Sequence, residues 1–377
     1  MPPHQRYLKD ISEEEVRILS ISAIFNDYFS IDWVHDLAKV KASKIIEALE
    51  KSVEKKVLKK ISFGTFAFNN NKIRQELLAS FSVEELESLH EKAAAILLQD
   101  LPYSDKRAMK ISGHLKKIAN SIEGCRLLAE AGDNFLKEHD YYNSLTCYGK
   151  VLKDLKDIFS EDADTLFVDT AVKYSKISTA ALAPKEVLKI LNVAMQRAAS
   201  SKNTEYQALL EMQIAKNEWL QSNYKTSLRH FDRGWSLSKD IVNPKLKRSI
   251  LTFKTSYPFW YGRYRDVIRS YEESIPEVEK LPNGKFSLFA GTIVGWSYTM
   301  MGQISQGVGM LDSIRVHCRK TNDYYVASTA SVAIGGGMYE ISRIDDAIQF
   351  CEEAISCLLY TSPSPRDRTR SRMPSSA

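Results

Sequence analysis

A repeat of 40 residues in the C-terminal two thirds of the chain constrains its fold more than any other feature. The repeat is marked by five anchor positions, and the residues four and seven places after each anchor are also mostly apolar or small. The anchors are Val187, Ser227, Val267, Gly307 and Ala347; the next series are Leu191, Phe231, Tyr271, Leu311 and Cys351, then Ala194, Gly234, Ser274, Ile314 and Ala354. Positions i, i+4 and i+7 lie on one face of an α-helix. Each unit is therefore predicted to contain a helix with that face buried.

Two further series predict a second helix in each unit. Small residues stand twelve places before the anchors, at Ser175, Ala215, Thr255, Gly295 and Gly335. Mostly larger residues stand three places before them, at Pro184, Tyr224, Tyr264, Ile304 and Ile344. We expect the small residues on the first helix, A, to let the second helix, B, approach closely. Because one helix pair cannot bury its apolar face alone, the pairs should stack into a superhelix.

An earlier unit has the same order of small and aromatic residues at a slightly longer spacing. Its members are Gly132, Phe135, Tyr141, Ser144, Tyr148 and Val151. Across residues 125–356 this order resembles the tetratricopeptide repeat, although the period is longer than usual and is typical of relatives in large bacterial regulators. The resemblance implies an all-α solenoid over 101–356 that binds a protein or small-molecule effector, with no catalytic residue, cofactor or metal.

In tetratricopeptide arrays the inner face of helix A lines a concave groove, and this implies a set of candidate ligand contacts. Counted from the small positions, that face carries Trp219, Phe259, Trp260, Trp296 and Tyr339, together with Lys176 and Lys216. Aromatic side chains are rigid anchors for ligands. The alternative interpretation is that these rings fill the space between successive A helices, since tryptophan is usually largely buried.

The first 100 residues follow a different pattern, which predicts a winged-helix domain. The signals are a capping box at Ser12–Glu15, helical spacing from Val16, from Ile31 and over 42–53, and alternating runs 57–63 and 65–68 joined at Gly64. Three helices followed by a β-hairpin are typical of a winged helix. Further helices are expected from about Asn70 and from the capping box at Ser82.

Two segments that follow the hairpin resemble a known linker. Phe66-Ala-Phe-Asn-Asn-Asn-Lys-Ile-Arg-Gln-Glu-Leu77 and Leu89-His-Glu-Lys-Ala-Ala94 are similar to the F-x-H-x-x-(I/V)-R-(E/Q)-A and LH-x-x-(A/I)-A segments of the signal-transduction ATPases called STAND. Asn69 stands where histidine is commoner, which puts a role tied to that ring in doubt. The resemblance implies an ATPase module upstream of Met1, with the winged helix as a packing and relay element.

Charge argues against a nucleic-acid partner. Near the third helix and the hairpin, lysines at 51, 55, 56, 59 and 60 alternate with glutamates at 47, 50 and 54, as on a solvated surface.

Residues 357–377 resemble one frame of a translated sequencing adapter, which would make this tail non-native and place the end of the natural segment near Ser356. Without its four arginines and one aspartate, the net charge falls from +5 to +2. The alternative is a native basic tail.

The sequence lacks the motifs that would indicate a membrane, secreted, metal-binding or nucleotide-binding protein. The chain has no apolar run long enough to span a membrane, no signal-peptide core at its N-terminus and no Cys-x-x-Cys pair among its five cysteines. No Gly-x-x-x-x-Gly-Lys-Ser/Thr nucleotide loop is present either. We therefore expect a cytoplasmic protein without a membrane partner.

Three functional hypotheses remain open from the sequence. The first is a non-catalytic sensor or scaffold fragment of a STAND-type signalling ATPase or multidomain regulator. The second is a stand-alone tetratricopeptide adaptor. The third is the sensor segment of a protein kinase or nucleotide cyclase. Genomic sequence upstream of Met1 would separate them: an in-frame nucleotide-binding loop supports the first, a promoter and stop codon the second, and kinase or cyclase motifs the third.

Overall fold

The computed structural model describes residues 11–178 and 184–361. Its contacts divide the chain into two compact units, residues 1–134 and 135–377, and each is described by itself. This is a division by packing, and the domain boundaries predicted at residues 100 and 356 stay predictions. Of the proposed non-native tail, residues 357–361 belong to the last helix, and 362–377 lie outside the described part of the chain.

Unit 1 begins with three helices and three short strands among the described residues. They are α1 (Glu13–Ser22), β1 (Phe29–Ser30), α2 (Ile31–Ala38), α3 (Ala42–Glu54), β2 (Leu58–Ser62) and β3 (Thr65–Phe68). The strands form an antiparallel sheet in the order β1-β3-β2. The predicted hairpin is thus confirmed, and β1 is an addition, because a strand of two residues gives no alternating pattern. Phe29 of β1 is buried and lies opposite Phe66 of β3.

Helices complete unit 1: α4 (Asn71–Leu78), α5 (Val83–Asp100), α6 (Asp105–Leu115) and α7 (Ile122–Lys137), which contains the unit boundary. The two predicted capping boxes are both formed. Ser12 accepts a bond from the backbone of Glu15, Ser82 accepts one from Glu85, and each glutamate accepts one in return. These bonds satisfy backbone groups that a helix start leaves unpaired.

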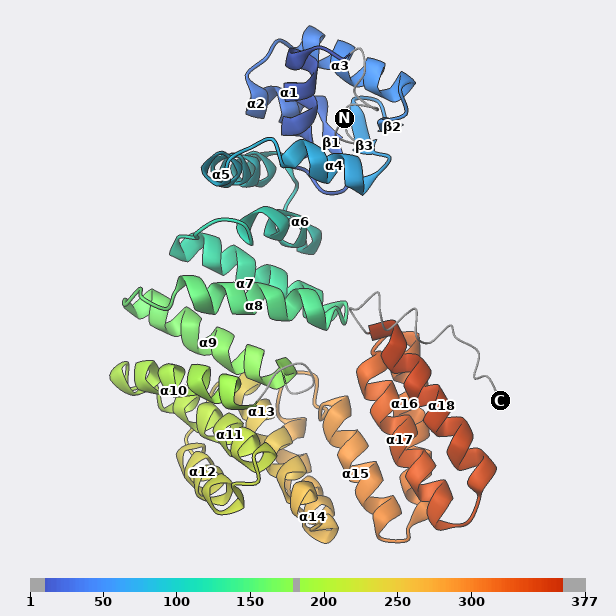
Figure 1. Cartoon of the computed structure of the whole chain (residues 1–377). Helices are drawn as coiled ribbons and strands as arrows, with labels where there is room; N and C mark the ends of the chain where they lie inside the picture. The colour runs from blue at the N-terminus through green and yellow to red at the C-terminus, as the bar shows by residue number, and fades with distance from the viewer. Residues whose placement is uncertain (1–10, 179–183, 362–377) are drawn as a thin grey trace. The chain divides into compact units, whose positions relative to one another are not determined.

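Unit 2 is a stack of helix pairs, seen side by side in Figure 1. After α8 (Tyr141–Asp154), the A helices are α9 (Glu161–Ile177), α11 (Thr204–Leu220), α13 (Pro244–Ser256), α15 (Leu288–Met300) and α17 (Tyr324–Glu340). The B helices are α10 (Pro184–Ser200), α12 (Tyr224–Leu237), α14 (Tyr264–Glu279), α16 (Ile304–Lys320) and α18 (Ile344–Thr361). Every B helix begins at the residue three places before its anchor, so the predicted 40-residue register is confirmed.

The small residues do allow close approach, and α15 and α16 show how closely. A Cβ atom added to Gly307 would lie 2.6 Å from the backbone oxygen of Gly295 and 2.8 Å from the backbone nitrogen of Thr299. At Gly295 an added Cβ would lie 2.8 Å from Leu311 Cγ. These separations are shorter than van der Waals contact, so the two helices could not pack this closely with larger residues at these positions.

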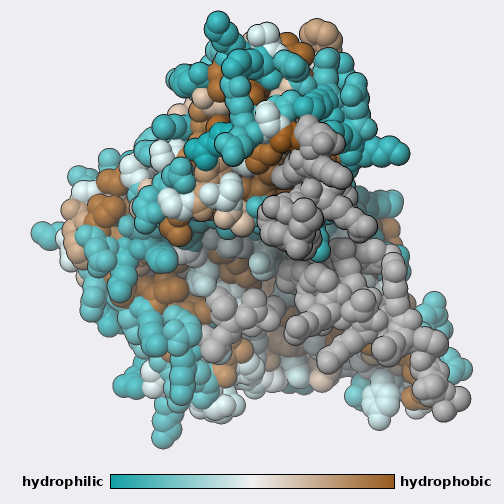
Figure 2. Space-filling view, turned by 45° about the horizontal axis from the view of Figure 1, so that its top comes forward, coloured by the Kyte–Doolittle hydropathy of each residue, from teal (hydrophilic) through white to brown (hydrophobic). Residues whose placement is uncertain are grey.

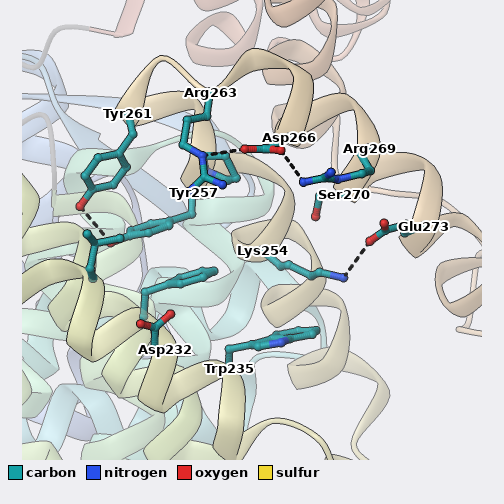
Figure 3. Close-up of a pocket in the computed structure, with 13 residues that line it drawn as sticks. Asp232, Trp235, Lys254, Tyr257, Tyr261, Arg263, Asp266, Arg269, Ser270 and Glu273 are labelled. Carbon is teal, nitrogen blue, oxygen red and sulfur yellow. Dashed lines mark hydrogen bonds and ion pairs between the residues drawn. The ribbon is translucent and has the colours of Figure 1, made fainter.

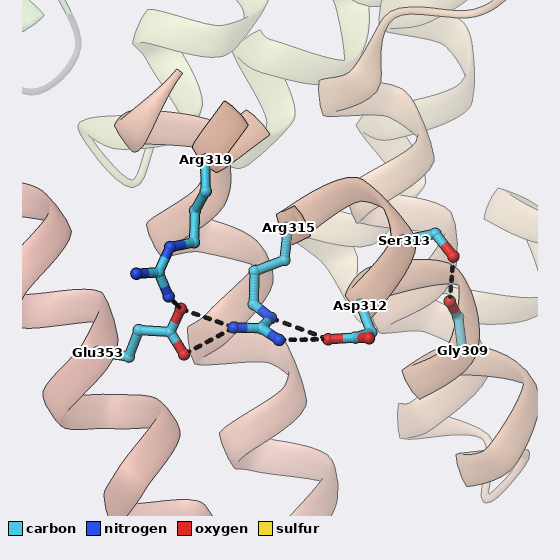
Figure 4. Close-up of polar contacts among 6 residues, drawn as sticks. All are labelled: Gly309, Asp312, Ser313, Arg315, Arg319 and Glu353. Carbon is cyan, nitrogen blue, oxygen red and sulfur yellow. Dashed lines mark hydrogen bonds and ion pairs between the residues drawn. The ribbon is translucent and has the colours of Figure 1, made fainter. Parts of the chain in front are cut away.

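A network of ion pairs joins the last two B helices (Figure 4). The Arg315 guanidinium donates to both carboxylate oxygens of Glu353, at 2.7 and 2.8 Å, and also to Asp312 on its own helix. Arg319 donates to the same Glu353 carboxylate. The Arg315 and Glu353 side chains are both mostly buried, so solvent screens this ion pair less than it screens exposed ones. The network holds α18 in register with α16.

The molecular surface has no single dominant apolar region in the face that Figure 2 shows, where hydrophobic side chains form separate patches among hydrophilic ones. Among the described residues, no helix combines the length and the apolar character that a membrane span requires.

Candidate functional site

Four of the five predicted groove aromatics form two pairs between successive units. The ring centroids of Trp219 and Trp260 are 5.5 Å apart, and those of Phe259 and Trp296 are 5.1 Å apart. All four side chains are half-buried. Tyr339 belongs to neither pair and is 64% exposed. The rings therefore join units to one another while part of their surface remains in contact with solvent.

A local break in helix A places two of these rings. After α13 the chain tightens into a 3₁₀ helix, η3 (Tyr257–Tyr261), where Pro258 cannot donate a backbone bond. Phe259 and Trp260 stand on η3, and Trp219 stands at the end of α11 beside Tyr224, the first residue of α12. These rings thus lie at the turn between helix A and helix B. Whether they contact a ligand stays a prediction.

The predicted lysines stand on successive A helices, Lys176 on α9 and Lys216 on α11. The Lys176 ammonium on α9 donates to Ser249 Oγ on α13 at 3.0 Å. Helix α11 packs between α9 and α13, and its other neighbours are the B helices α10 and α12. The contact from α9 to α13 therefore passes across the inner side of α11. Lys216 occupies on α11 the position that Lys176 occupies on α9, one repeat earlier.

The inner surface around these lysines perturbs their titration. Burial lowers the pKa of Lys216 to about 8. The Lys176 side chain is exposed, but surrounding protein atoms desolvate its ammonium and the charge of Lys245 adds to this, so that its pKa is also lowered to about 8. Lys173 on the same helix pairs with Asp169 at 2.7 Å. The structure thus gathers lysines from three successive A helices around one surface.

A cavity of about 240 Å³ opens among α12, α13, η3 and α14 (Figure 3). Phe231 and Tyr257 form part of its wall, with stacked rings whose centroids are 4.0 Å apart. Lys254 lies over the ring of Trp235 at 4.7 Å. Sequence reasoning missed this cavity, because the turn at η3 and the spacing of α12 and α14 are set by packing between repeats.

The charged groups that line this cavity are balanced in number, with Lys254, Arg263 and Arg269 against Asp232, Asp266 and Glu273. Arg263 and Arg269 both donate to Asp266, and the Lys254 ammonium lies 3.9 Å from Glu273. The Ser270 hydroxyl, which also lines the cavity, has no hydrogen-bond partner among the described residues. The cavity is thus an aromatic recess whose charged rim is balanced, so charge directs neither a cation nor an anion to it.

The residues of the STAND-like segments are structural within unit 1. The Asn69 side-chain amide donates to the backbone oxygens of Lys56 and Leu58, at 2.9 and 3.0 Å. Neutral histidine carries one ring N–H, so the asparagine supplies a bond that histidine would lack here. Arg74 is buried, and its Nε donates to the Phe25 backbone oxygen at 3.1 Å.

The half-buried His90 of the second segment contacts another histidine, the buried His114. The Nδ1 atoms of His90 and His114 are 3.0 Å apart, linking α5 to α6. Burial lowers the pKa of His90 to about 4 and that of His114 to about 3, and nearby cationic groups add to both shifts. Among the described residues, no group of three or more histidine, cysteine, aspartate or glutamate side chains is placed to hold a metal ion.

Comparison with solved structures shows the fold. The chain is similar to a STAND protein with a tetratricopeptide repeat sensor from Pyrococcus horikoshii, with 15% identity, a TM-score of 0.53, and coverage of 96% of this chain and 52% of that one. It is also similar to aspartyl phosphate phosphatase F from Bacillus subtilis, with 11% identity, a TM-score of 0.47, and coverage of 86% and 82%. The apo quorum sensor NprR from B. thuringiensis matches with 12% identity, a TM-score of 0.42, and coverage of 87% and 97%.

The first comparison shows a tetratricopeptide-like helical-repeat fold. The chain spans about half the length of that STAND protein. No protein-family model matches the chain, and no curated protein sequence matches it.

Proposed function

We propose that this chain is the non-catalytic sensor segment of a STAND-type signalling ATPase, in which the helical repeats bind a protein or peptide effector. The concave surface lined by α9, α11 and α13 receives the effector. The elements of unit 1 act as a winged-helix linker, which relays the binding event to a nucleotide-binding module elsewhere in the parent protein.

The observation that carries this proposal is the match in the order of parts. Nearly the whole chain, including unit 1, superposes on half of a protein that joins a STAND ATPase to a tetratricopeptide sensor. The order α1-β1-α2-α3-β2-β3 in unit 1 supports the winged-helix part of the proposal. The short segments around Arg74 and His90, which resemble the STAND linker in sequence, lie directly after these elements.

The packing of unit 1 supports a relay role. Arg74 ties α4 to the backbone at Phe25, the end of the α1 region, and the His90–His114 contact ties α5 to α6. These buried and partly buried polar contacts restrict how the helices can move, because a donor or acceptor that loses its partner in the interior costs about 1–3 kcal/mol. A displacement of α6 would therefore be transmitted to α5 rather than absorbed.

Peptide selection with the purified chain tests the binding function. A library of random peptides displayed on phage would be selected against the wild-type chain, and the enriched peptides remeasured by calorimetry. We expect binding that weakens at least tenfold in Lys216→Ala, on the inner side of α11, and stays unchanged in Lys225→Ala, on the outer helix α12. Enriched peptides that bind both variants equally would contradict a concave site.

The assignment to a STAND protein has a separate test. The open reading frame would be extended upstream of Met1 in the source genome, where an in-frame nucleotide-binding loop is expected. A stop codon and promoter there would instead favour the adaptor hypothesis, and kinase or cyclase motifs the third one. The purified chain itself should not bind ATP in equilibrium dialysis.

A further inference from the structure

We propose that the inner surface formed by Lys173, Lys176, Lys216 and Lys245 is an anion-binding site, which takes carboxylate or phosphate groups of the effector. This inference rests on the proposed function, because it names the chemistry of the ligand at the same concave surface. It adds two lysines that the repeat register does not pick out, Lys173 and Lys245, and it commits the ligand to negative charge.

The first step in the argument is the curvature of the array. Lys176 on α9 reaches Ser249 on α13, although α11 packs between these two helices. A lysine side chain can bridge to the second helix along only where the inner surface is sharply concave. Side chains from all three A helices therefore converge on one volume, so that one compact ligand can contact them together.

The second step is the charge around Lys176. Besides burial, the ammonium groups of Lys245, Lys173 and Lys216 disfavour its charged form, and among the described residues the Asp169 carboxylate opposes them. Asp169 is already engaged, because it pairs with Lys173 at 2.7 Å and accepts a bond from the Tyr206 hydroxyl at 2.9 Å. Glu205, at the start of α11, accepts bonds from the backbone of Val242 and Asn243. The cluster thus retains excess positive charge.

The third step is the energetic consequence. Like charges held together in a partly desolvated recess repel one another more strongly than on an open surface, because solvent screens them less. Burial lowers the pKa of both Lys176 and Lys216 to about 8, and at Lys176 the neighbouring ammonium groups add to the effect of burial. An anion that enters the recess relieves the repulsion and forms charge-assisted bonds with several donors at once.

The contrast with the cavity at α12–α14 supports the choice of this surface. There, Arg263 and Arg269 share Asp266, and Lys254 lies near Glu273, so each cation already has an acidic neighbour. Around Lys176 the cations outnumber the carboxylates that act on it. Charge complementarity therefore directs an anionic group to the concave lysines rather than to the cavity.

Calorimetric titration of the full chain with defined anions tests the proposal. The probes are inorganic pyrophosphate, an acetylated and amidated hexaglutamate peptide, and the matching hexaglutamine peptide. We expect at least one anionic probe to bind and hexaglutamine not to bind. In Lys176→Gln/Lys216→Gln the affinity should fall at least tenfold. In Lys189→Gln/Lys225→Gln, which removes the same charge from the outer helices α10 and α12, it should fall less than twofold.

Further controls separate the possible outcomes. The variant Lys176→Arg/Lys216→Arg keeps the charge and should bind within a few fold of the wild-type chain, which excludes loss of folding as the cause. Stronger binding of pyrophosphate than hexaglutamate would identify phosphate as the source of the anion, and the reverse would identify carboxylates. Equal weakening in the inner and outer variants, or no binding of either anion by the wild-type chain, would overturn the proposal.

The proposed function can survive that failure. If peptides selected against the chain are neutral, and lose affinity in Lys216→Ala but not in Lys216→Gln, the concave surface binds an effector through packing and the anion inference alone is wrong. If selected peptides ignore every inner-surface variant, both proposals fail together.

Discussion

At the scale of single residues, the sharpest constraint on this fold is the absence of a side chain at Gly307. We predict that Gly307→Ala destabilises unit 2, because the new Cβ would meet the Gly295 oxygen at 2.6 Å and force α15 and α16 apart. Overpacking of this kind costs about 1–3 kcal/mol. Thermal unfolding followed by circular dichroism should show a lower midpoint.

The same helix supplies the control for that prediction. Gly309 is exposed on α16, and a Cβ added there would meet nothing within 4 Å. Since alanine is a better helix former than glycine by about 1 kcal/mol, Gly309→Ala should leave the midpoint unchanged or raise it. If both substitutions raised the midpoint, the close approach of the two helices would be wrong.

A second residue-scale prediction concerns the His90–His114 contact and pH. The pKa values of both rings are lowered in the folded chain, to about 4 and about 3, so the unfolded chain takes up protons first as pH falls below about 6.5. Stability is therefore complete above that pH and declines as pH falls towards the folded-state values. At pH 5 the loss is about 2 kcal/mol for buried His114 and less for half-buried His90.

The measurement compares unfolding midpoints at pH 7 and pH 5. His90→Gln should reduce the drop between the two pH values, because it removes one of the two titrating rings. His35→Gln, which removes an exposed histidine on α2, should leave the drop unchanged. An equal drop in all chains would mean that the buried pair does not control acid stability.

Residues that act within the repeat could be predicted from the sequence, and residues that act between distant segments could not. The positions of Gly295 and Gly307 follow from a 40-residue period that packing within one helix pair imposes. The contact of Lys176 with Ser249 depends on how sharply the stack curves, and that depends on many small differences in interhelical packing. The 3₁₀ turn at Pro258 also could not be predicted, because it departs from the regular helix pair in one unit and the 40-residue period describes only what the units share.

At the scale of elements, α8 and the start of α17 meet although they are far apart in the chain. The Tyr141 hydroxyl donates to Asp323 at 3.3 Å, and the rings of Tyr141 and Tyr325 are 5.8 Å apart. Asp323 also accepts the backbone N–H of Val326, which caps α17. Burial and the Asp323 carboxylate raise the pKa of Tyr141, which keeps its hydroxyl protonated as a donor.

We predict that Tyr141→Phe loosens this contact while it preserves the ring packing. The loss of one partly buried hydrogen bond should cost about 1 kcal/mol, felt locally rather than across unit 2. Hydrogen exchange read by mass spectrometry should quicken in the peptides around residues 139–143 and 322–326. Tyr142→Phe, at an exposed neighbouring hydroxyl, is the control, and equal exchange in both variants would show that the bond contributes nothing.

At the scale of the whole molecule, the regular register explains why the fold can be inferred without a family match. Each B helix of unit 2 begins at the predicted residue, because every unit packs its two helices together through small residues at the same repeat positions. The charged residues on the A helices are not repeated from unit to unit in this way. The excess lysines on α9, α11 and α13 have no counterparts on α15, and α17 likewise carries no lysine or arginine. The array is thus uniform in architecture and graded in charge.

The described end of the array leads to a prediction about association. Helix α18 exposes Ile344, Ile348 and Ile355, which are 47%, 52% and 59% accessible and share a helix face at spacings of four and seven residues. Contiguous apolar surface of this kind promotes association, so light scattering should show a mass that rises above 42.8 kDa with concentration. Ile348→Lys/Ile355→Lys should restore a constant mass, whereas Val83→Lys/Val242→Lys, at isolated exposed residues, should not. A constant monomer mass for the wild-type chain would show that this face does not associate.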